Sequence, residues 1–322
     1  FVGTGNIASW MAHVVRTTPA ATLGAVASRD MDKAQSFAAE HGAQQAYDSW
    51  QEMLEWEAVD AVYVATPTSL REEVSVAAAV AGKHVLAEKP FASLPSLERI
   101  TAACRKNGVG FMDATHFVHH PRYAAIRKNA AKIIGRPRLL DTRFLVQLTD
   151  RNDIRYNPAL EPLGAIGDLG WYNMRAILEY LAPTGPARNV TTRVRRDPET
   201  GVIIAGKGTL AFNDGMQSSW QCRFDGASVD IGLDLAGADG VLRMANFVGE
   251  DDDHSASYHC AGSSASTSAG AETRITSQQS GPALMFTDFA ALTRNTDQRE
   301  HWMQASERTQ ALLDTVLAAA GT

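Results

Sequence analysis

The sequence has few cysteines, no long apolar run and no surplus of positive charge. The three cysteines, Cys104, Cys222 and Cys260, are scattered and lack metal-ligand spacing, which argues against a disulfide framework and favours a reducing cytoplasm. No segment approaches the roughly 20 apolar residues that a membrane-spanning helix needs. A formal net charge of -6 argues against a nucleic-acid or anionic-membrane partner, because phosphate binding needs clustered Lys and Arg. We therefore expect a cytoplasmic protein that binds a small molecule.

Length and composition indicate two globular domains. With 322 residues the chain exceeds one typical hydrophobic core, and its hydrophobic and charged fractions, 45% and 20%, are those of an ordinary globular protein. No signal peptide is visible. The chain opens on FVGTG, already at the end of a strand, so we expect native residues to be missing before Phe1.

Residues 1–117 alternate strands and helices at short intervals. Apolar strand segments lie at about 22–28, 58–67, 84–90 and 109–115, with helical segments between them. Such alternation predicts βαβ units and a doubly wound parallel sheet, the Rossmann arrangement.

Residues 118–322 do not alternate in this way, and their pattern predicts an α+β domain. Between about 190 and 247, long strands are joined by the turns DPETG, FNDG, FDGA and GADG, which predicts a mainly antiparallel sheet. A helix is expected around 167–181, and a last helix, from about 297 to 320, can pack back on the first domain. The Ser-, Gly- and Ala-rich segment 260–281 is predicted to be a mobile loop between edge strands.

A glycine motif follows the first strand. The segment GTGNIA places Gly3, Gly5 and Ala8 between a strand and a helix, as in the G-x-G-x-x-G/A pattern of dinucleotide-binding turns. The first Gly makes the tight turn, and the second lets the backbone approach a pyrophosphate. The helix start at Asn6 and Ile7 offers N–H groups to the phosphates. The motif predicts a dinucleotide site; the alternative is a tight turn without a ligand.

The end of the second strand bears on the choice between NADP and NAD. An NAD enzyme usually has an acid there for the ribose hydroxyls, but this chain reads ASRD, with Ser28 and Arg29 in that place. A hydroxyl and a guanidinium suit a 2′-phosphate, so we favour NADP as the cofactor, with NAD as the alternative. Otherwise Arg29 is a surface charge; Asp30 is expected to cap the next helix in either case.

Four segments in order resemble one known family. They are GTGNIA, VATPTSL, AGKHVLAEKPFA and GDLGWYNMRAI. Together they resemble the glucose–fructose oxidoreductase / inositol dehydrogenase (Gfo/Idh/MocA) family over essentially the whole chain, closest to its dihydrodiol dehydrogenase and sugar ketoreductase branch. The resemblance implies an NAD(P)-binding Rossmann domain and a C-terminal α+β domain with an open, mainly antiparallel sheet. It also implies that the other face of this sheet forms the contact of a homodimer or homotetramer.

The resemblance further implies the residues of an active site. The family's EKP lysine corresponds to Lys89, and its Asp and His-or-Tyr pair in the second domain corresponds to Asp168 and Tyr172. Thr66 and Pro67 correspond to strand-end residues that line the nicotinamide side, where the substrate binds.

The chain departs from the family pattern in three places. Where members often have P-N-x-x-H, it has PTSLR, which ends at Arg71. Tyr172 stands where inositol dehydrogenases carry His, and VHHP replaces an R-F-H-P-like stretch. The last two departures argue against inositol as the substrate. The Tyr form resembles the sugar ketoreductase, glucose–fructose oxidoreductase and dihydrodiol dehydrogenase branches.

Lys89 and Tyr172 suit the proton transfer that accompanies hydride transfer. We expect Tyr172 to donate the proton in reduction while Lys89 polarises the substrate oxygen; the reverse assignment stays open, because the two can titrate as a unit. Asp168 would orient Lys89 or a substrate hydroxyl, and Glu88 is expected near the nicotinamide ribose. Alternatively, Tyr172 is a core aromatic and Asp168 a helix N-cap, a role that can coexist with the first.

Other polar residues are weaker candidates. His116 is a candidate substrate contact, whereas His119 and His120 are interpreted as structural, and the spacing of the three does not match a tetrahedral metal site. Arg155 either contacts the substrate or anchors its loop, and Trp171 is expected in the core. We expect no bound metal.

The residues and the resemblance together predict an NADP-dependent oxidoreductase. It would interconvert a carbonyl and a secondary alcohol on a sugar, a sugar derivative or a cyclic diol. The alternatives are a non-catalytic regulator of the same fold that senses the nicotinamide dinucleotide, and a structural subunit without a ligand.

Overall fold

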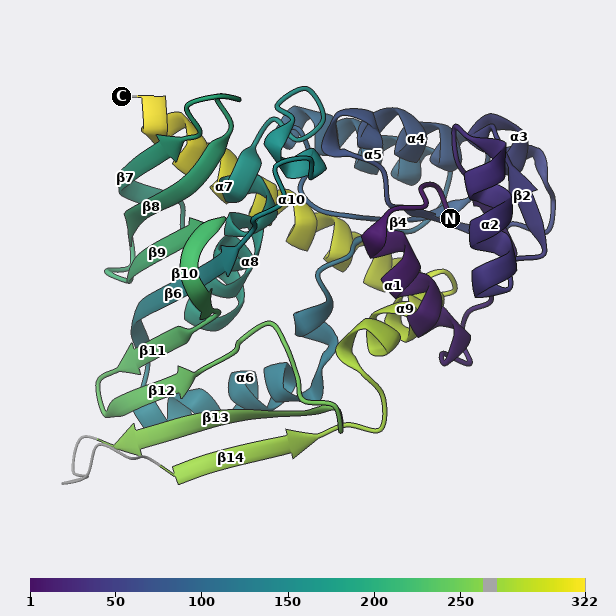
Figure 1. Cartoon of the computed structure of the whole chain (residues 1–322). Coiled ribbons are helices and arrows are strands. Elements are labelled where there is room, and N and C mark those ends of the chain that lie inside the picture. The colour runs from purple at the N-terminus through teal and green to yellow at the C-terminus, as the bar shows by residue number, and fades with distance from the viewer. Residues whose placement is uncertain (263–270, 322) are drawn as a thin grey trace. The chain divides into compact units, whose positions relative to one another are not determined.

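The computed structural model describes residues 1–262 and 271–321 and divides the chain into two compact units. The first unit comprises Phe1–His116 and Pro282–Glu307, and the second comprises Phe117–Gly281 and Arg308–Thr322. Figure 1 traces both units along the chain. None of the helices in the described ranges combines the length and the apolar character that crossing a membrane requires.

The first unit is built on parallel strands joined by the first residues of the chain. The strands are β1 (Ala25–Ala27), β2 (Gln45–Tyr47), β3 (Ala61–Val64), β4 (His84–Ala87) and β5 (Phe111–Asp113). β1 pairs with β2, and β4 pairs with β3 and β5, all in parallel. Val2 bridges Ala27 on one side and Val64 on the other, which gives the order β2–β1–Val2–β3–β4–β5. Strands up to β2 are added on one side of Val2 and strands from β3 onward on the other, so Val2 marks the switch point at which doubly wound sheets bind ligands.

Helices cover both faces of this sheet. They are α1 (Asn6–Arg16), α2 (Met31–His41), α3 (Trp50–Glu55), α4 (Thr68–Val80), α5 (Leu94–Lys106), α9 (Gly281–Leu292) and the first part of α10 (Thr296–Ala318). Figure 1 shows α1 and α9 on one side of β4, and α4 and α5 on the other. Met11, Tyr63, Leu86 and Phe289 are among the buried residues that join α1, the sheet and α9 in one core. Burial on both faces explains why β3 and β4 read as continuous apolar runs.

The second unit contains a nine-stranded, mainly antiparallel sheet in the order β14-β13-β12-β11-β6-β9-β8-β7, with β10 beside β6. Its strands are β6 (Pro137–Gln147), β7 (Ala187–Arg196), β8 (Ile203–Phe212), β9 (Gln217–Arg223), β10 (Asp225–Asp230), β11 (Leu233–Gly237), β12 (Gly240–Met244), β13 (Ser255–Gly262) and β14 (Ala271–Thr276). β6 and β9 pair in parallel, and the other neighbours pair antiparallel. Alternation of buried and exposed residues along β9 shows that one face of the sheet is covered.

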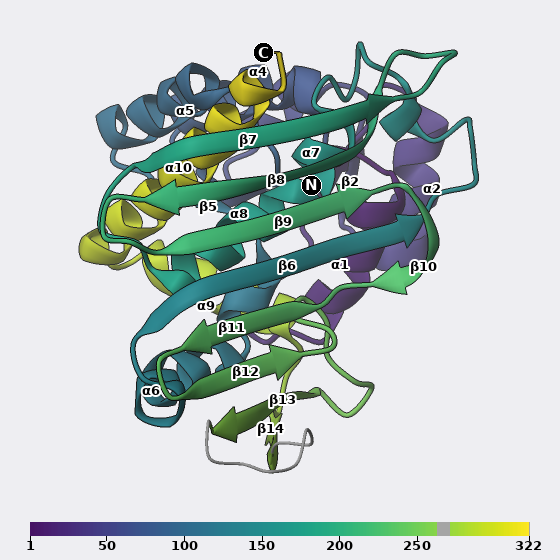
Figure 2. The same ribbon diagram turned by 90° about the vertical axis from the view of Figure 1, so that its left-hand side faces the viewer.

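The helices of the second unit pack on that covered face. They are η1 (His116–His119), α6 (Pro121–Ile134), η2 (Ile154–Tyr156), α7 (Gly164–Asp168), α8 (Gly170–Ala176), the π-helical η3 (Ile177–Leu181), the end of α10 and η4 (Ala319–Gly321). α7 and α8 contact the central strands β6, β8 and β9, and α6 contacts β11 to β14. Figure 2 looks onto the other face, which no described helix of this unit covers.

The predicted fold class is confirmed, with two local corrections. The helix expected around 167–181 is present, but it is interrupted at Leu169 between α7 and α8 and ends in the π-helical η3. The loop predicted for 260–281 is wrong at 260–262, which end β13, and at 271–276, which form β14, while residues 263–270 lie outside the described residues. The domain limits 1–117 and 118–322 stay a prediction.

Candidate active site

The carboxyl ends of neighbouring strands bring the predicted cofactor residues to one edge of the first sheet. The glycine loop follows Val2, Ser28 follows β1, Thr66 lies just beyond β3, and Lys89 lies just beyond β4. Gly3 is required by the packing at this edge. Its φ is +111°, and a Cβ there would lie 2.7 Å from the carbonyl oxygen of Ala65, at the end of β3.

The start of α1 suits a pyrophosphate. Gly5 is the N-cap of α1 and carries no side-chain cap, so the N–H groups of the first turn, from Asn6 and Ile7 onward, have no side-chain partner at the cap. No acidic side chain lies in this first turn to repel an anion. A Cβ at Gly5 would meet no atom within 4 Å, so there is open space beside the backbone. These features fit the phosphates of a dinucleotide.

The end of β1 favours a phosphate over free ribose hydroxyls. The hydroxyl of Thr4 lies 3.5 Å from that of Ser28, and Arg29 next to them is exposed. Asp30 caps α2, as predicted, because its carboxylate accepts hydrogen bonds from the N–H groups of Asp32 and Lys33 at 3.0 and 3.2 Å. The acid nearest to this edge is therefore engaged by its helix, and Ser28 and Arg29 remain as the groups for the adenosine ribose.

The ends of β3 and β4 place Thr66, Pro67 and Lys89 side by side. Val64 pairs with Ala87, so the two chain segments leave the sheet at the same level. Pro67 is the N-cap of α4, and the peptide between Lys89 and the following proline is cis. The backbone that carries Lys89 is therefore adjacent to the residues predicted to line the nicotinamide.

Glu88 is buried rather than open to a ligand. The residue is 5% exposed, and its carboxylate accepts a hydrogen bond of 2.6 Å from the phenol of Tyr63 on β3. Burial raises the pKa of Glu88, while Lys89, the Tyr63 hydrogen bond and the guanidinium of Arg71 act in the opposite direction. The predicted contact of Glu88 with a nicotinamide ribose stays a prediction.

In the second unit, Asp168 and Arg155 form one ion pair. Nε of Arg155 donates to a carboxylate oxygen of Asp168 at 2.6 Å, and Nη1 lies 3.2 Å from both carboxylate oxygens of Asp153. Asp168 raises the pKa of Arg155, with a smaller contribution from Asp153. Asp168 is the last residue of α7, so the interpretation of it as an N-cap is wrong; Leu169 takes that position for α8.

Tyr172 lies on α8 and is held by aromatic side chains. The residue is 8% exposed, and its ring centroid lies 5.3 Å from that of Phe144 on β6 and 6.3 Å from that of Phe117. The next residue, Asn173, is fully buried and donates to the carbonyl oxygens of Thr142 and Gln221, both at 3.1 Å. α8 is thereby fixed on the sheet, and the position of Tyr172 with it. Packing of this kind suits the core-aromatic alternative as well as a rigidly held phenol.

The histidines after β5 separate into different environments. His116 belongs to the first unit, where its ring meets the half-exposed ring of Trp10 edge-on at 5.6 Å. His120 is the N-cap of α6 and accepts from the N–H of Arg122, which confirms its structural role. Among the described residues, no group of three His, Cys, Asp or Glu side chains is arranged to hold a metal ion. Trp171 is fully buried, as expected.

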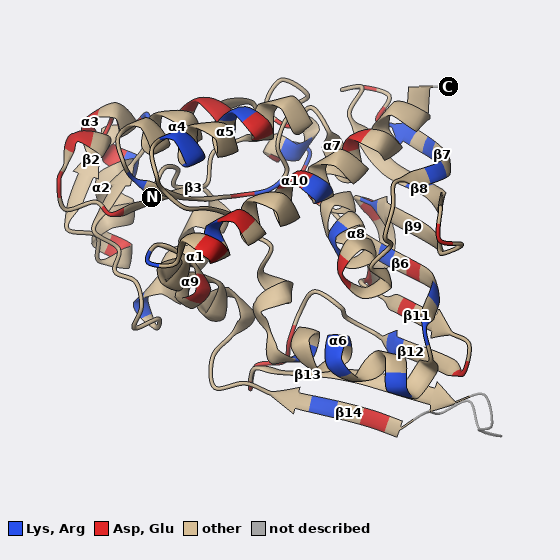
Figure 3. Cartoon of the chain, turned by 180° about the vertical axis from the view of Figure 1, so that it is seen from behind, with Lys and Arg blue, Asp and Glu red and all other residues tan. Residues whose placement is uncertain are grey.

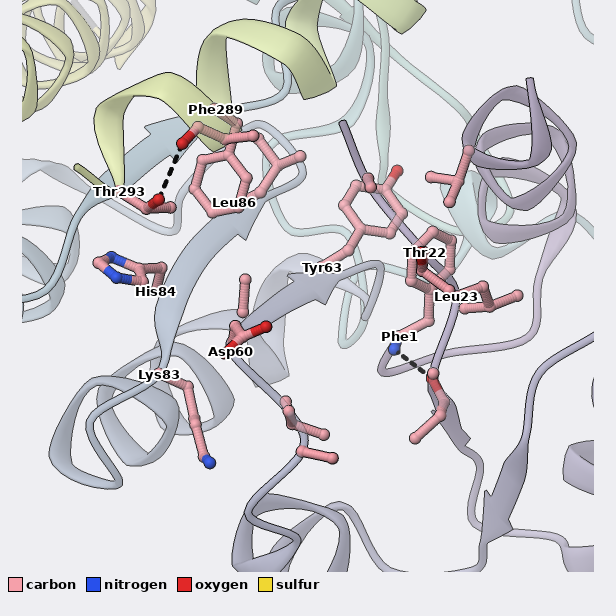
Figure 4. Close-up of a pocket in the computed structure, with 18 of the residues that line it drawn as sticks. Phe1, Thr22, Leu23, Asp60, Tyr63, Lys83, His84, Leu86, Phe289 and Thr293 are labelled. Carbon is pink, nitrogen blue, oxygen red and sulfur yellow. Dashed lines mark hydrogen bonds between the residues drawn. The ribbon is translucent and has the colours of Figure 1, made fainter. Parts of the chain in front are cut away.

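A hollow of about 780 Å³ lies at the opposite edge of the first sheet. Figure 4 shows its lining, which includes Phe1, Asp60, Lys83, His84 and Phe289. Apart from Phe289, which lies on α9, these residues precede or begin the strands, whereas doubly wound sheets bind their ligands beyond the strands' carboxyl ends. Nδ1 of His84 already accepts the N–H of Gly110 at 2.7 Å. The predicted site therefore stays at the edge that carries the glycine loop.

Several contacts of the site were not predicted from the sequence. No sequence pattern marks Tyr63, Asp153 or Asn173, because the contacts that each makes depend on tertiary packing. Thr4 lies inside the glycine motif, and Arg71 stands out in the sequence only as a departure from the family pattern.

Comparison with known proteins places the first part of the chain beside one oxidoreductase family. Residues 1–114 match the family described as the Gfo/Idh/MocA oxidoreductase family with an NAD-binding Rossmann fold. The chain is 32% identical over 200 residues to the dTDP-3,4-didehydro-2,6-dideoxy-alpha-D-glucose 3-reductase of Actinomadura kijaniata, covering 62% of this chain and 59% of the reductase. It is also 32% identical over 203 residues to the D-xylose 1-dehydrogenase (NADP(+)) 2 of Haloferax volcanii, covering 62% and 61%.

A solved structure extends the likeness to the whole fold. It is a 3-ketoreductase from Actinomadura kijaniata in complex with NADP and TDP-benzene, with a TM-score of 0.89 and 25% identity. The match covers 99% of this chain and 96% of that one. In sequence, by contrast, the chain spans only about 60% of the length of the curated relatives that it matches.

Proposed function

Because residues 1–114 match the Gfo/Idh/MocA oxidoreductase family, we propose that the protein is an NADP-dependent oxidoreductase. It interconverts a carbonyl and a secondary alcohol on a sugar, a sugar derivative or a cyclic diol. The substrate class is supported by relatives named as a deoxy-sugar 3-reductase, a xylose dehydrogenase and a dihydrobenzenediol dehydrogenase.

One observation carries this proposal. The glycine loop, the Ser28–Arg29 pair, the Thr66–Pro67 pair and Lys89 follow neighbouring strands at the carboxyl edge of one sheet. A dinucleotide whose pyrophosphate lies on the start of α1 would then have its adenosine ribose near Arg29. Its nicotinamide would lie toward Lys89, which is the arrangement that hydride transfer to a substrate requires.

The bound nicotinamide would supply or accept the hydride. The protein must then move one proton at the substrate oxygen, and a positioned acid–base group contributes about 10²–10⁴-fold to such a step. We assign this proton to Tyr172 in reduction, with Lys89 polarising the same oxygen. Asp168 would orient Lys89 or a substrate hydroxyl.

The test is a panel of sugars and cyclic diols with NADP+, and of keto sugars with NADPH, followed at the NADPH absorbance band. Turnover of at least one substrate is expected, together with quenching of tryptophan fluorescence by NADPH. Binding of NADPH without turnover of any substrate would instead favour the nicotinamide-sensing regulator. Absence of NADPH binding at high micromolar concentration would contradict both functions.

We also propose a homodimer or homotetramer formed through the uncovered face of the second sheet. In Figure 3, Lys and Arg are interspersed with Asp and Glu along its strands. Arg143 on β6 pairs with Asp141 at 2.7 Å and with Asp230 at 3.0 Å. A face of mixed sign can match its own copy across a twofold axis.

Leu139 supplies a test of this interface, because it is 46% exposed on β6, the strand between β11 and β9. Leu139→Glu should shift the mass measured by analytical ultracentrifugation toward the monomer. Ile133→Glu is the matched control, since Ile133 is an exposed apolar residue on α6 rather than on a strand of the sheet. A wild-type protein that sediments as a monomer would contradict the proposal.

Finally, we propose the cytoplasm as the compartment of this protein. All three cysteines are free, and burial raises the pKa of both Cys104 and Cys222 to about 12, which keeps these thiols protonated and unreactive. Localisation of the tagged full-length protein by fractionation tests this proposal, and recovery outside the cytoplasm would contradict it.

A further inference from the structure

Arg71 is a buried cation at an unfavourable position. It lies in the first turn of α4 and is 4% exposed. The N-terminus of a helix is the positive end of its dipole, so a cation in the first turn does not stabilise the helix. Burial of a guanidinium adds a desolvation cost unless its donors find partners. The stability of α4 therefore does not account for this residue.

The partners of Arg71 lie on two separate chain segments. Nη2 donates to the carbonyl oxygen of Thr66 at 2.5 Å, and Nη1 donates to the carbonyl oxygen of Pro90 and to the hydroxyl of Thr68 at 3.1 Å. Thr66 lies just beyond β3, and Pro90 directly follows Lys89. The planar guanidinium fork thus links the carboxyl ends of two neighbouring strands, which a single ammonium group cannot do in the same geometry.

We propose that Arg71 is a positioning residue for Lys89. By tying the backbone on the far side of Lys89 to the end of β3, it holds the lysine in one orientation toward the substrate oxygen. The proposal deepens the proposed function and rests on it. It gives a reason for arginine at the position where the family pattern often has histidine: two backbone carbonyls on separate segments need one donor group that reaches both.

The charge of Arg71 provides a second readout. The groups that act on the buried carboxylate of Glu88 are Lys89 beside it, Tyr63 on β3 and Arg71 on α4. Arg71 opposes the rise in the pKa of Glu88 that burial causes. Loss of this cation should let Glu88 take up a proton at higher pH. The acid limb of the pH–rate profile should then move to higher pH, which a purely structural change would not produce.

Two substitutions separate the effect of the hydrogen bonds that Arg71 makes to two chain segments from the effect of its charge. Arg71→Met removes both, so kcat should fall about 10- to 100-fold, the loss expected for a catalytic group displaced by about 1 Å. KM for NADPH should change much less, and the acid limb should move. Arg71→Lys keeps the charge without the double contact, so its acid limb should stay at the wild-type pH while kcat remains reduced.

The matched control is Arg122→Met. Arg122 is equally buried, and its side chain donates to the carbonyl oxygens of Asn246, Phe247, Gly249 and Ser257, none of which is assigned to the site. This variant should lose thermal stability but keep kcat and the pH profile. A kcat for Arg71→Met equal to that of the wild type, or an equal loss in Arg122→Met, would overturn the proposal.

Hydrogen exchange keeps the inference testable if no substrate is ever found. In folded Arg71→Met and Arg71→Lys proteins, the amides of residues 66–70 and 88–93 should exchange faster than in the wild type, while those of β11 should not. Unchanged exchange in both segments would overturn the positioning role whatever the activity. A wild-type protein without turnover but with faster exchange in the variants would reject the proposed function alone.

Discussion

The two units hold their candidate site residues in different ways. In the first unit, Lys89 is carried by backbone at a strand end, and the charges around it, Glu88 and Arg71, are almost fully buried. In the second unit, Tyr172 is held by aromatic rings, and Asp168 pairs with Arg155, whose side chain is 40% exposed. The first half of the site is fixed by strand ends and buried hydrogen bonds, and the second by helix packing and a partly solvated ion pair.

Because of this difference, substitutions in the two units should affect stability and activity to different degrees. A buried charge that loses its partner costs far more than an exposed one, because its desolvation is no longer compensated. Substitutions in the first unit should therefore change both stability and chemistry. Substitutions around Asp168 should act more mildly and mainly on the substrate.

The largest effects are expected from Lys89→Met and Tyr172→Phe. Each should lower kcat about 10²–10⁴-fold, since each removes a group that acts on the proton at the reacting oxygen. The double variant should lose little more than the worse single one, because residues that act as a unit are not additive. Single-turnover rates with NADPH and a keto sugar measure this. A Tyr172→Phe protein with wild-type kcat would show that Tyr172 is a core aromatic and takes no part in the chemistry.

Arg29→Ala should have the next largest effect, confined to the first unit. Charge-assisted hydrogen bonds contribute about 1.5–3 kcal/mol, so the preference for NADP over NAD should fall about 10- to 100-fold in kcat/KM. The value for NAD should hardly change. Arg16→Ala, which removes an exposed cation at the far end of α1, should leave the preference as it is. An unchanged preference for NADP over NAD in Arg29→Ala would show that Arg29 is only a surface charge.

The sequence predicted the placement of the candidate residues in the first unit better than in the second, for a physical reason. Strand ends of a parallel sheet meet at one edge, so the order of the motifs along the chain already placed the glycine loop, Ser28 and Lys89 together. In the second unit, the site depends on how α7 and α8 pack on the sheet. Gly164 shows this dependence: its φ is +52°, and a Cβ there would lie 2.3 Å from the carbonyl oxygen of Ile203.

The elements that escaped prediction are those with weak local patterns. β2, at Gln45–Tyr47, is a three-residue edge strand with no fully buried residue, and α3, at Trp50–Glu55, has fewer than two turns. Such short segments offer too few residues for a period to emerge. The break between α7 and α8 has no proline to announce it; α7 packs against β8 and β9, and α8 against β6 and β9.

A milder effect is expected from Arg155→Met. Loss of one charge-assisted hydrogen bond to Asp168 should lower kcat/KM about 10-fold, through substrate binding or through the orientation of Asp168. Arg151→Met is the control from the same loop, because Arg151 pairs instead with Asp197 and Glu199. Steady-state kinetics of both variants measure this difference in kcat/KM. A kcat loss as large as that of Lys89→Met would show that the second half of the site is as tightly coupled as the first.

The smallest effect concerns the stability conferred by the buried carboxylate. Because the pKa of Glu88 in the folded protein lies above its ordinary value of 4.5, the folded state holds this proton more tightly than the unfolded chain does. The contribution of Glu88 to stability is therefore full below pH 4.5 and falls as pH rises through the raised pKa. Glu88→Gln has no such titration, so its free energy of unfolding in urea should fall less between pH 5 and pH 8.

Glu72→Gln provides the opposite sign for that measurement. Arg99 holds the pKa of the partly buried Glu72 below its ordinary value, so the contribution of this pair is lost as pH falls, not as it rises. Relative to the wild type, Glu72→Gln should thus diverge below about pH 4.5, where Glu72 of the wild type begins to take up its proton, whereas Glu88→Gln should diverge above that pH. If Glu88→Gln and the wild type keep the same pH dependence, Glu88 is ionised throughout. The first half of the site would then be a fully charged network, as the ion pair of the second half already is.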